Sequence, residues 1–261
     1  MNPFDKISVN FNRLSKSEKN TCTLILNNPQ AIIDNSITEA AKIYNVSAAS
    51  IQRVSKKIGN KGYSELKYSL ETYMSNQNDE SKNQTSLSEQ FFDIYASTLL
   101  EWKNEIENNK IQQLVKLIYD KNVKAIGIGN SGLAASHLVY SLYMYGKWTE
   151  CVDNITKIDY LEYSCNKDDL FILFSISGKI TNSSQIKKWK KEGVSVVLIT
   201  ANENASIKKD VDFSIVIPTV PMILDQNSNI ILDNRTNLYI LIDLILLNYL
   251  SIYGKIKATN I

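Results

Sequence analysis

The sequence predicts two domains of different fold class. An all-α helix-turn-helix head is joined to an α/β domain that is flavodoxin-like, with a five-stranded parallel sheet and helices on both faces. The first 75 residues show helical spacing of apolar positions. A polar stretch without apolar anchors follows at 76–86, and short runs rich in Val and Ile then alternate with helical patterns. We therefore expect domains at 1–75 and 87–257, joined by a linker at 76–86.

Length and composition are those of a globular protein. The chain has 261 residues, of which 44% are hydrophobic and 21% charged, so it is long enough for two modest domains. We expect no signal peptide, because the first residues lack an apolar core flanked by basic residues. The run 238–253 is interrupted by Asp243 and Asn248, so we expect a buried helix and no membrane contact. Three scattered cysteines predict reduced thiols in a cytoplasmic protein, with no metal site and no cofactor.

The head contains the start signals of several helices. Ser15 and Glu18 have capping-box spacing, and Ser36 is an N-cap for the helix that follows it. Asn45 stands where a turn between two helices needs a positive φ angle. Ser47 is then the N-cap of the next helix, which ends near Gly59. Another helix is expected from Gly62 to about residue 74.

The helix after Ser47 has the pattern of a DNA-reading helix. Ile51, Val54 and Ile58 form its buried stripe, which leaves polar and basic residues on the other faces. Residues 1–75 hold 10 Lys and Arg against 6 Asp and Glu, a net charge of +4 that suits contact with phosphates. An ordinary solvated surface helix is the alternative. The residues predicted to contact DNA are Ser47, Ala48, Ser50, Gln52, Arg53, Lys56 and Lys57.

The second domain begins with two expected helices, at 87–108 and 111–121. Runs of four to seven residues separated by helical segments then predict parallel strands with crossover helices. The expected strands are 123–129, 149–152, 170–175, 194–200 and 213–218.

Two strand ends carry small polar residues. The first reads Gly-Ile-Gly-Asn-Ser-Gly at 127–132, which places amide, hydroxyl and backbone N–H donors at a helix start. Its glycine spacing is one residue short of a dinucleotide fingerprint. The other strand end gives Ser175, Ser177 and Gly178. Small hydroxyls and bare amides on two strand ends indicate a monophosphate site without magnesium, although a simple tight turn is the alternative at Ser177 and Gly178.

The order of these motifs resembles the RpiR-type family of bacterial transcriptional regulators. That family joins a helix-turn-helix head to a SIS (sugar isomerase) domain that senses phosphorylated sugars. The matching segments are NPQAI, AAKIYNVSAASIQRVSKKIG, NKGYSELK, GIGNSGLAA and SISG, together with Asp233-Asn234-Arg235-Thr236 before the final helix. The resemblance implies that Asn130 and Ser131 belong to one sugar-phosphate loop, and Ser175, Ser177 and Gly178 to the other.

The second loop of this chain departs from the family's usual sequence, and this departure leaves several hypotheses about ligand and function open. The family's second loop usually continues Ser-Gly-Glu-Thr, whereas this chain has Lys179 and Ile180, with Thr181 displaced by one position. Either Lys179 supplies charge to the phosphate or the ligand differs. A SIS-type aldose–ketose isomerase with His137 as its base is one alternative function. A degenerate SIS domain that only dimerises the heads is another.

The predicted partners follow from the regulator hypothesis. They are double-stranded DNA with a palindromic operator and a phosphorylated sugar effector. A palindrome read by two heads requires a homodimer or a higher homo-oligomer, with the reading helices about 34 Å apart.

Overall fold

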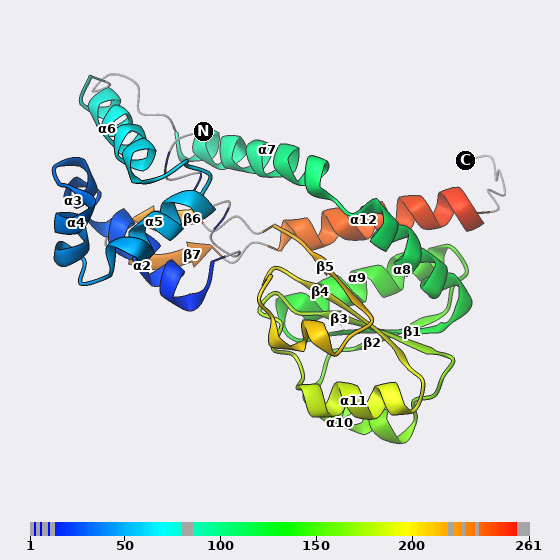
Figure 1. Ribbon diagram of the computed structural model, residues 1–261. Helices are drawn as coiled ribbons and strands as arrows, with labels where there is room; N and C mark the ends of the chain where they lie inside the picture. Colours follow the sequence, from blue (N-terminus) through cyan, green and yellow to red (C-terminus); the bar gives the residue numbers. More distant parts are fainter. Residues whose placement is uncertain are drawn as a thin grey trace, which may run out of the picture. The chain divides into compact units, whose positions relative to one another are not determined.

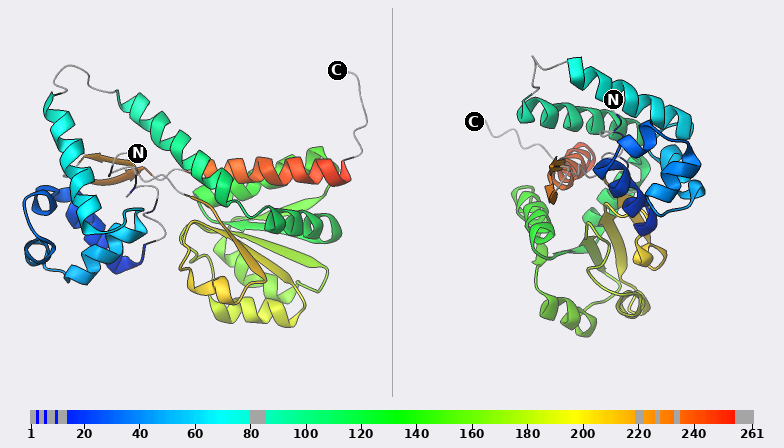
Figure 2. Two further views of the ribbon diagram at one scale, coloured as in Figure 1. Left: turned by 45° about the horizontal axis from the view of Figure 1, so that its top comes forward. Right: turned by 90° about the vertical axis from the view of Figure 1, so that its left-hand side faces the viewer.

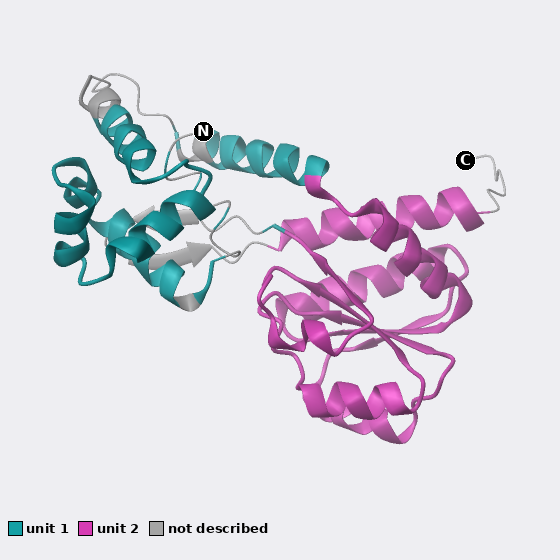
Figure 3. Ribbon diagram, in the orientation of Figure 1, with its two compact units in different colours: residues 1–104, 218–234 teal, residues 105–217, 235–261 magenta. Residues whose placement is uncertain are grey.

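The computed structural model describes residues 3, 6, 10, 14–79, 86–218, 222–225, 228–232 and 235–254 (Figure 1). The chain divides into two compact units. Unit 1 comprises Met1–Asn104 with Pro218–Asn234, and unit 2 comprises Glu105–Ile217 with Arg235–Ile261 (Figure 3).

Unit 1 contains the predicted helical head. Its core is a cluster of apolar side chains that all lie between Leu14 and Leu70, including the fully buried Ile25, Ile32 and Ile51. The helices of this unit are α2 (Lys16–Asn27), α3 (Gln30–Ile33), α4 (Ile37–Ile43), α5 (Ala48–Lys57), α6 (Tyr63–Asp79) and α7 (Leu87–Glu105). A two-stranded antiparallel hairpin, β6 (Met222–Asp225) and β7 (Ser228–Leu232), belongs to the same unit. The sequence pattern did not predict this hairpin.

Capping residues set the helix starts of the head, as the sequence predicts. The hydroxyl of Ser15 accepts from the N–H of Glu18, whose carboxylate accepts from the N–H of Ser15 in return. Ser36 and Glu39 form the same reciprocal capping box at the start of α4. Each box provides partners for N–H groups that a helix start otherwise leaves free.

The start of α6 is hydrogen-bonded to the backbone at the end of α3 and in the turn that follows it. The hydroxyl of Tyr63 lies 3.1 Å from the carbonyl oxygen of Ile32 and 3.0 Å from that of Asn35. The ammonium of Lys67 donates to the same Asn35 carbonyl at 3.2 Å. The NKGYSELK segment therefore joins α6 to the turn between α3 and α4.

The predicted linker differs in part from the structure. Helix α6 continues to Asp79, into the range 76–86, while residues 80–85 lie outside the described part of the chain. Helix α7, expected in the second domain, groups with the head in unit 1. Polar composition marks a segment without apolar anchors, but it does not show which unit the following helix joins.

Unit 2 has the predicted five-stranded parallel sheet. Its strands are β1 (Asn122–Gly127), β2 (Thr149–Val152), β3 (Asp169–Phe174), β4 (Ser195–Thr200) and β5 (Phe213–Val216). The strand order is β2-β1-β3-β4-β5, and every pair is parallel. This is the flavodoxin-like order. All six residues of β3 are buried, as expected for a central strand covered on both faces.

Helices cover both faces of the sheet, as Figures 1 and 2 show. One face carries α8 (Asn108–Asp120), α9 (Asn130–Met144) and α12 (Thr236–Tyr253), and the other carries α10 (Ile155–Tyr160) and α11 (Ser183–Lys191). Short 3-10 helices η2 (Leu161–Tyr163) and η3 (Ser206–Lys209) complete the connections. By length and composition α12 could cross a membrane. It packs against α8 and α9 and buries seven residues, as a core helix does: Asn237, Leu238, Leu241, Ile242, Ile245, Leu246 and Tyr249.

Candidate functional site

The turn between α4 and α5 has the geometry that the sequence predicts. Asn45 has φ +53°, and its N–H donates to the carbonyl of Lys42. The N–H of Val46 donates to the carbonyl of Ala41 at 3.0 Å. Together these bonds make a Schellman motif, which ends α4 and turns the chain. Ser47 then caps α5 by accepting from the N–H of Ser50 at 3.0 Å.

The outer face of α5 presents polar and basic groups in a row. The hydroxyls of Ser47 and Ser50 are 2.8 Å apart, and the guanidinium of Arg53 lies 3.4 Å from the Ser50 hydroxyl. Arg53 and Lys56 are exposed, whereas Ile51, Val54 and Ser55 are buried on the opposite face. The side chain of Arg53, in the middle of α5, therefore reaches back toward the N-terminal turn of the helix, the part that a reading helix presents to base edges.

Two of the residues predicted to contact DNA, Gln52 and Lys57, bond to other residues of the head in this structure. The side-chain oxygen of Gln52 accepts from the N–H of Tyr63 at 3.0 Å. Its amide nitrogen lies 2.8 Å from where a Cβ on Gly62 would stand, so a side chain at position 62 would displace the end of Gln52. Gln52 would have to break this hydrogen bond to reach DNA. The sequence pattern could not show this, because Gln52 lies off the apolar stripe like any exposed residue.

Lys57 forms an ion pair with Glu18 of α2, with an N–O distance of 3.0 Å. Burial raises the pKa of Glu18, but the hydrogen bonds from Ser15 and Lys57 outweigh it and hold the pKa below its usual value. To bind a DNA phosphate, Lys57 would therefore have to give up its ion pair with Glu18. Ala48 is half-buried and packs against the core of the head.

We expect Gln52→Ala to destabilise the head by about 1 kcal/mol, because the N–H of Tyr63 loses its acceptor. Thermal unfolding of the native chain and the variant measures the effect. Gln52→Glu is the matched control, since it keeps an acceptor at the same position. Weakened DNA binding by Gln52→Ala with unchanged unfolding temperature would contradict this internal role and favour a base contact.

In unit 2 the two predicted loops lie side by side. Strand order reverses between β1 and β3, and the last residue of β1, Gly127, pairs with the last residue of β3, Phe174. The loops that follow these residues therefore leave the same edge of the sheet at neighbouring points. This switch point is where open α/β sheets bind ligands.

The first loop brings the start of α9 close to the end of β1. A Cβ on Gly127 would stand 2.5 Å from the carbonyl oxygen of Ser131. Gly129 has φ +59° and occupies the N-cap position of α9 without a side-chain cap. The helix thus presents the N–H groups of its first turn, from Asn130 onward, at the switch point. Asn130 is exposed and Ser131 is buried.

The second loop is a tight turn held onto the end of β4. The N–H of Gly178, at φ +69°, donates to the carbonyl of Ser175 at 3.0 Å. The buried Ser175 hydroxyl accepts from the N–H of Lys179 at 3.1 Å. Its own O–H proton remains a donor. Ser177 and Lys179 are exposed.

Sequence reasoning missed two residues that position the second loop. The hydroxyl of Thr200 donates to the carbonyl of Ile176 at 3.1 Å, and the side chain of Asn202 donates to the carbonyl of Ser177 at 2.9 Å. Thr200 is the last residue of β4, and Asn202 lies two positions further on. The signal that could have found them is a polar residue at the end of an apolar strand, with a second polar residue just beyond it.

The structure shows what replaces the family's threonine. Ile180 is half-buried and packs against the core that contains Trp189. The hydroxyl of Thr181 donates to the side-chain oxygen of Gln185. Neither residue is a free donor at the switch point, so Lys179 is the residue of this segment that supplies an exposed charge.

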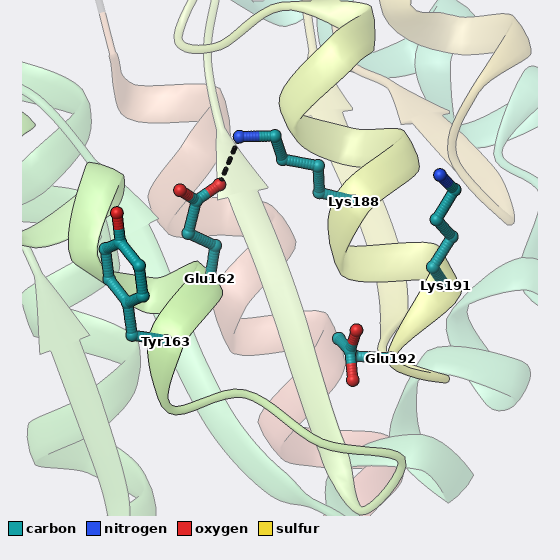
Figure 4. Close-up of a pocket in the computed structure, with 5 residues that line it drawn as sticks. All are labelled: Glu162, Tyr163, Lys188, Lys191 and Glu192. Carbon is teal, nitrogen blue, oxygen red and sulfur yellow. Dashed lines mark hydrogen bonds and ion pairs between the residues drawn. The ribbon is translucent and has the colours of Figure 1, made fainter.

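Two other features lie apart from these loops. His137 is exposed on α9, with its ring centroid 5.3 Å from that of Tyr239 on α12. A surface hollow of about 270 Å³ lies between η2 and the second half of α11 (Figure 4). Glu162 and Lys188, 2.7 Å apart, form an ion pair in its lining. The lining residues are Glu162, Tyr163, Lys188, Lys191 and Glu192.

A helix-turn-helix head with a flavodoxin-like unit defines a two-domain DNA-binding regulator. Residues 1–77 match the helix-turn-helix domain of the rpiR family, and residues 116–248 match the SIS domain. The chain belongs to the RpiR-type family of transcriptional regulators. This confirms the resemblance and the fold class predicted from the sequence.

The chain is similar to known transcriptional regulators over most of its length. The chain is 25% identical over 227 residues to an uncharacterized HTH-type transcriptional regulator of Clostridium perfringens, covering 83% of this chain and 81% of the relative. It is 22% identical over 223 residues to the HTH-type transcriptional regulator HexR of Escherichia coli, covering 82% and 77%.

Solved structures show the same fold. The Vibrio vulnificus NanR protein, complexed with ManNAc-6P, aligns with a TM-score of 0.55 at 18% identity, covering 97% of this chain and 92% of that protein. The sugar isomerase domain of an RpiR transcription factor from Sphaerobacter thermophilus aligns with a TM-score of 0.53 at 17% identity, covering 63% and 90%.

Proposed function

We propose that this protein is a cytoplasmic regulator of sugar or amino-sugar metabolism genes whose affinity for its operator is set by a phosphorylated sugar. The observation that carries the proposal is the pair of neighbouring loops at the β1/β3 switch point, in a chain whose head is a helix-turn-helix. The related NanR protein holds ManNAc-6P, a phosphorylated amino sugar.

The phosphate would lie between the two loops. The first turn of α9 offers N–H groups and the positive end of a helix dipole, which favour an anion. Ser175 and Ser177 add hydroxyl donors, and Lys179 adds charge. The proposed contacts are Asn130, Ser131, Ser175, Ser177, Gly178 and Lys179.

The regulator would act as a homodimer on a palindromic operator. Two copies of α5 must then enter successive major grooves about 34 Å apart. A sugar phosphate that binds two arrangements of the heads unequally shifts operator affinity, with a useful coupling of about 1–3 kcal/mol.

A thermal-shift screen tests the proposed effector class. Purified protein is heated with a panel of hexose and amino-sugar phosphates, each paired with its unphosphorylated sugar. We expect at least one phosphate to raise the unfolding temperature while its partner sugar does not. A gel shift with and without that compound then reports the change in operator affinity. Equal shifts by phosphorylated and plain sugars would overturn a phosphate site.

We further expect no isomerase activity. His137 faces Tyr239 on the outer side of α9, and aldose–ketose isomerisation needs a base at the C1–C2 edge of the sugar. Purified protein incubated with each phosphate should yield no ketose or aldose product above the protein-free control by chromatography. Turnover that His137→Ala abolishes would establish the isomerase alternative instead.

A further inference from the structure

The residue that follows β2 brings a carboxylate to the edge of the sheet from which the two loops leave. Val152, the last residue of β2, pairs with Ile126 of β1, and Asp153 comes directly after it. Strand β2 neighbours β1 on the side away from β3, and adjacent strands are about 4.8 Å apart. Asp153 therefore lies one strand away from the proposed phosphate site.

Asp153 also lies against the first turn of α9. A Cβ on Gly132 would stand 3.6 Å from the Cβ of Asp153, so the two positions adjoin. The sulfur of Cys151, on β2, lies 3.9 Å from the carbonyl oxygen of the same glycine. Burial raises the pKa of the Cys151 thiol, and the nearby carboxylate of Asp153 adds to the rise. The helix start that would hold the phosphate therefore has a carboxylate beside it.

The carboxylate of Asp153 is accessible to a ligand. Its side chain is 61% exposed, and its Oδ1 lies 3.7 Å from the Nζ of Lys157, whose side chain is 62% exposed. This separation is longer than a hydrogen bond, and ion pairs between exposed side chains contribute little free energy. A cationic group of a ligand can therefore replace Lys157 beside Asp153 with little loss.

The end of β4, on the other side of the switch point, differs from the end of β2. The hydroxyl of Thr200 donates to the carbonyl of Ile176 and accepts from the N–H of Asn202. The side chain of Asn202 donates to the carbonyl of Ser177 and accepts from the N–H of Asn204. These two side chains are thus engaged in holding the second loop, whereas Asp153 presents its charge to solvent.

We infer that the phosphorylated sugar carries a free, protonated amine and that Asp153 binds this amine. The inference rests on the proposed function and narrows its effector class. A hydroxyl or an acetylated amine can also donate to a carboxylate, but both are neutral, and hydrogen bonds with charged partners are roughly twice as strong. The phosphate would be matched by the start of α9 and by Lys179, and the amine by Asp153.

Calorimetry with matched sugar phosphates tests this inference. The probes are the 6-phosphates of glucose, galactose and mannose, each with a hydroxyl, a free amine or an acetamide at carbon 2. We expect the native chain to bind the amine form of at least one series about fivefold or more tightly than both other forms. Asp153→Asn keeps the shape of the side chain and should bring the affinity for the amine form down to that for the hydroxyl form.

Two further variants make the assignment specific. Glu203→Gln is the matched control, because Glu203 is an exposed acid just beyond the end of β4, and it should retain the native preference. Lys157→Gln removes the cation that competes for Asp153, so it should increase the preference for the amine form. This opposite sign keeps the inference testable if Asp153→Asn does not fold, which circular dichroism checks for every variant.

The possible failures of this inference and of the proposed function can be told apart. A native chain that binds the three forms alike, or prefers the hydroxyl or the acetamide, would overturn the inference alone. So would an effector from the thermal-shift screen that has no amine, a preference that persists in Asp153→Asn, or one that is lost in Glu203→Gln. If no phosphorylated sugar bound at all, the proposed function would be wrong as well.

Discussion

Arg53→Ala is expected to weaken binding to the operator by about 1–3 kcal/mol, roughly 5- to 150-fold, if the guanidinium makes a bidentate contact to a base. Arg53 is exposed on the face of α5 that also carries Ser47 and Ser50. The measurement is a titrated gel shift on a DNA fragment selected by the native protein from a random-sequence pool. Binding to unrelated DNA should change less, because a base contact carries the specificity.

Two lysine variants serve as controls for this prediction. Lys56→Ala should weaken binding to all sequences alike and reduce the dependence on salt concentration, as loss of a phosphate contact does. Lys57→Ala should have a smaller effect, because Lys57 already pairs with Glu18. Unchanged affinity in all three variants would contradict the assignment of α5 as the reading helix.

Ser175→Ala is expected to weaken the response to a sugar phosphate tenfold or more. The hydroxyl can donate to the phosphate, and a hydrogen bond to a charged group is worth about 1.5–3 kcal/mol. The same oxygen accepts from the N–H of Lys179, so the substitution also loosens the turn that presents Ser177. Calorimetry with the compound found by thermal shift measures the dissociation constant of each variant.

Charge at the second loop gives an independent check on that prediction. Lys179→Glu should abolish the response if the ammonium contacts the phosphate, and should leave ligand-free DNA binding intact. Lys191→Glu is the matched control, because Lys191 is an exposed lysine on α11, at the hollow between α11 and η2. If Ser175→Ala, Ser177→Ala and Lys179→Glu all bound the sugar phosphate with native affinity, the assignment of the phosphate site to these loops would be wrong.

The fold could be predicted from the sequence because its signals are local and repeated. The capping residues Ser15, Ser36 and Ser47, and the positive φ of Asn45, each depend on a few neighbouring residues. The five strands were visible as apolar runs at regular spacing, and the observed bounds differ by a few residues. The two serine-bearing loops could be placed together because parallel strands end at the same edge of a sheet.

The roles of individual side chains could not be predicted in the same way. Gln52 and Lys57 have partners 11 and 39 positions away in the sequence, and helical spacing carries no information about such contacts. Ile180 joins the core beside Trp189, a fact that depends on how α11 lies on the sheet. The hairpin of β6 and β7 joins unit 1 from a distant part of the chain, so no pattern in the head indicated it.

The position of α12 after the five strands in chain order has a consequence for synthesis on the ribosome. The five strands are complete at Val216, but α8 and α9 gain their cover only when α12 has been made, up to Tyr253. At about 5–20 residues per second this interval lasts roughly 2–7 s. During it the nascent chain presents the surfaces of α8 and α9 against which α12 later packs. Premature termination before Thr236 should therefore yield an aggregating product instead of a smaller working sensor.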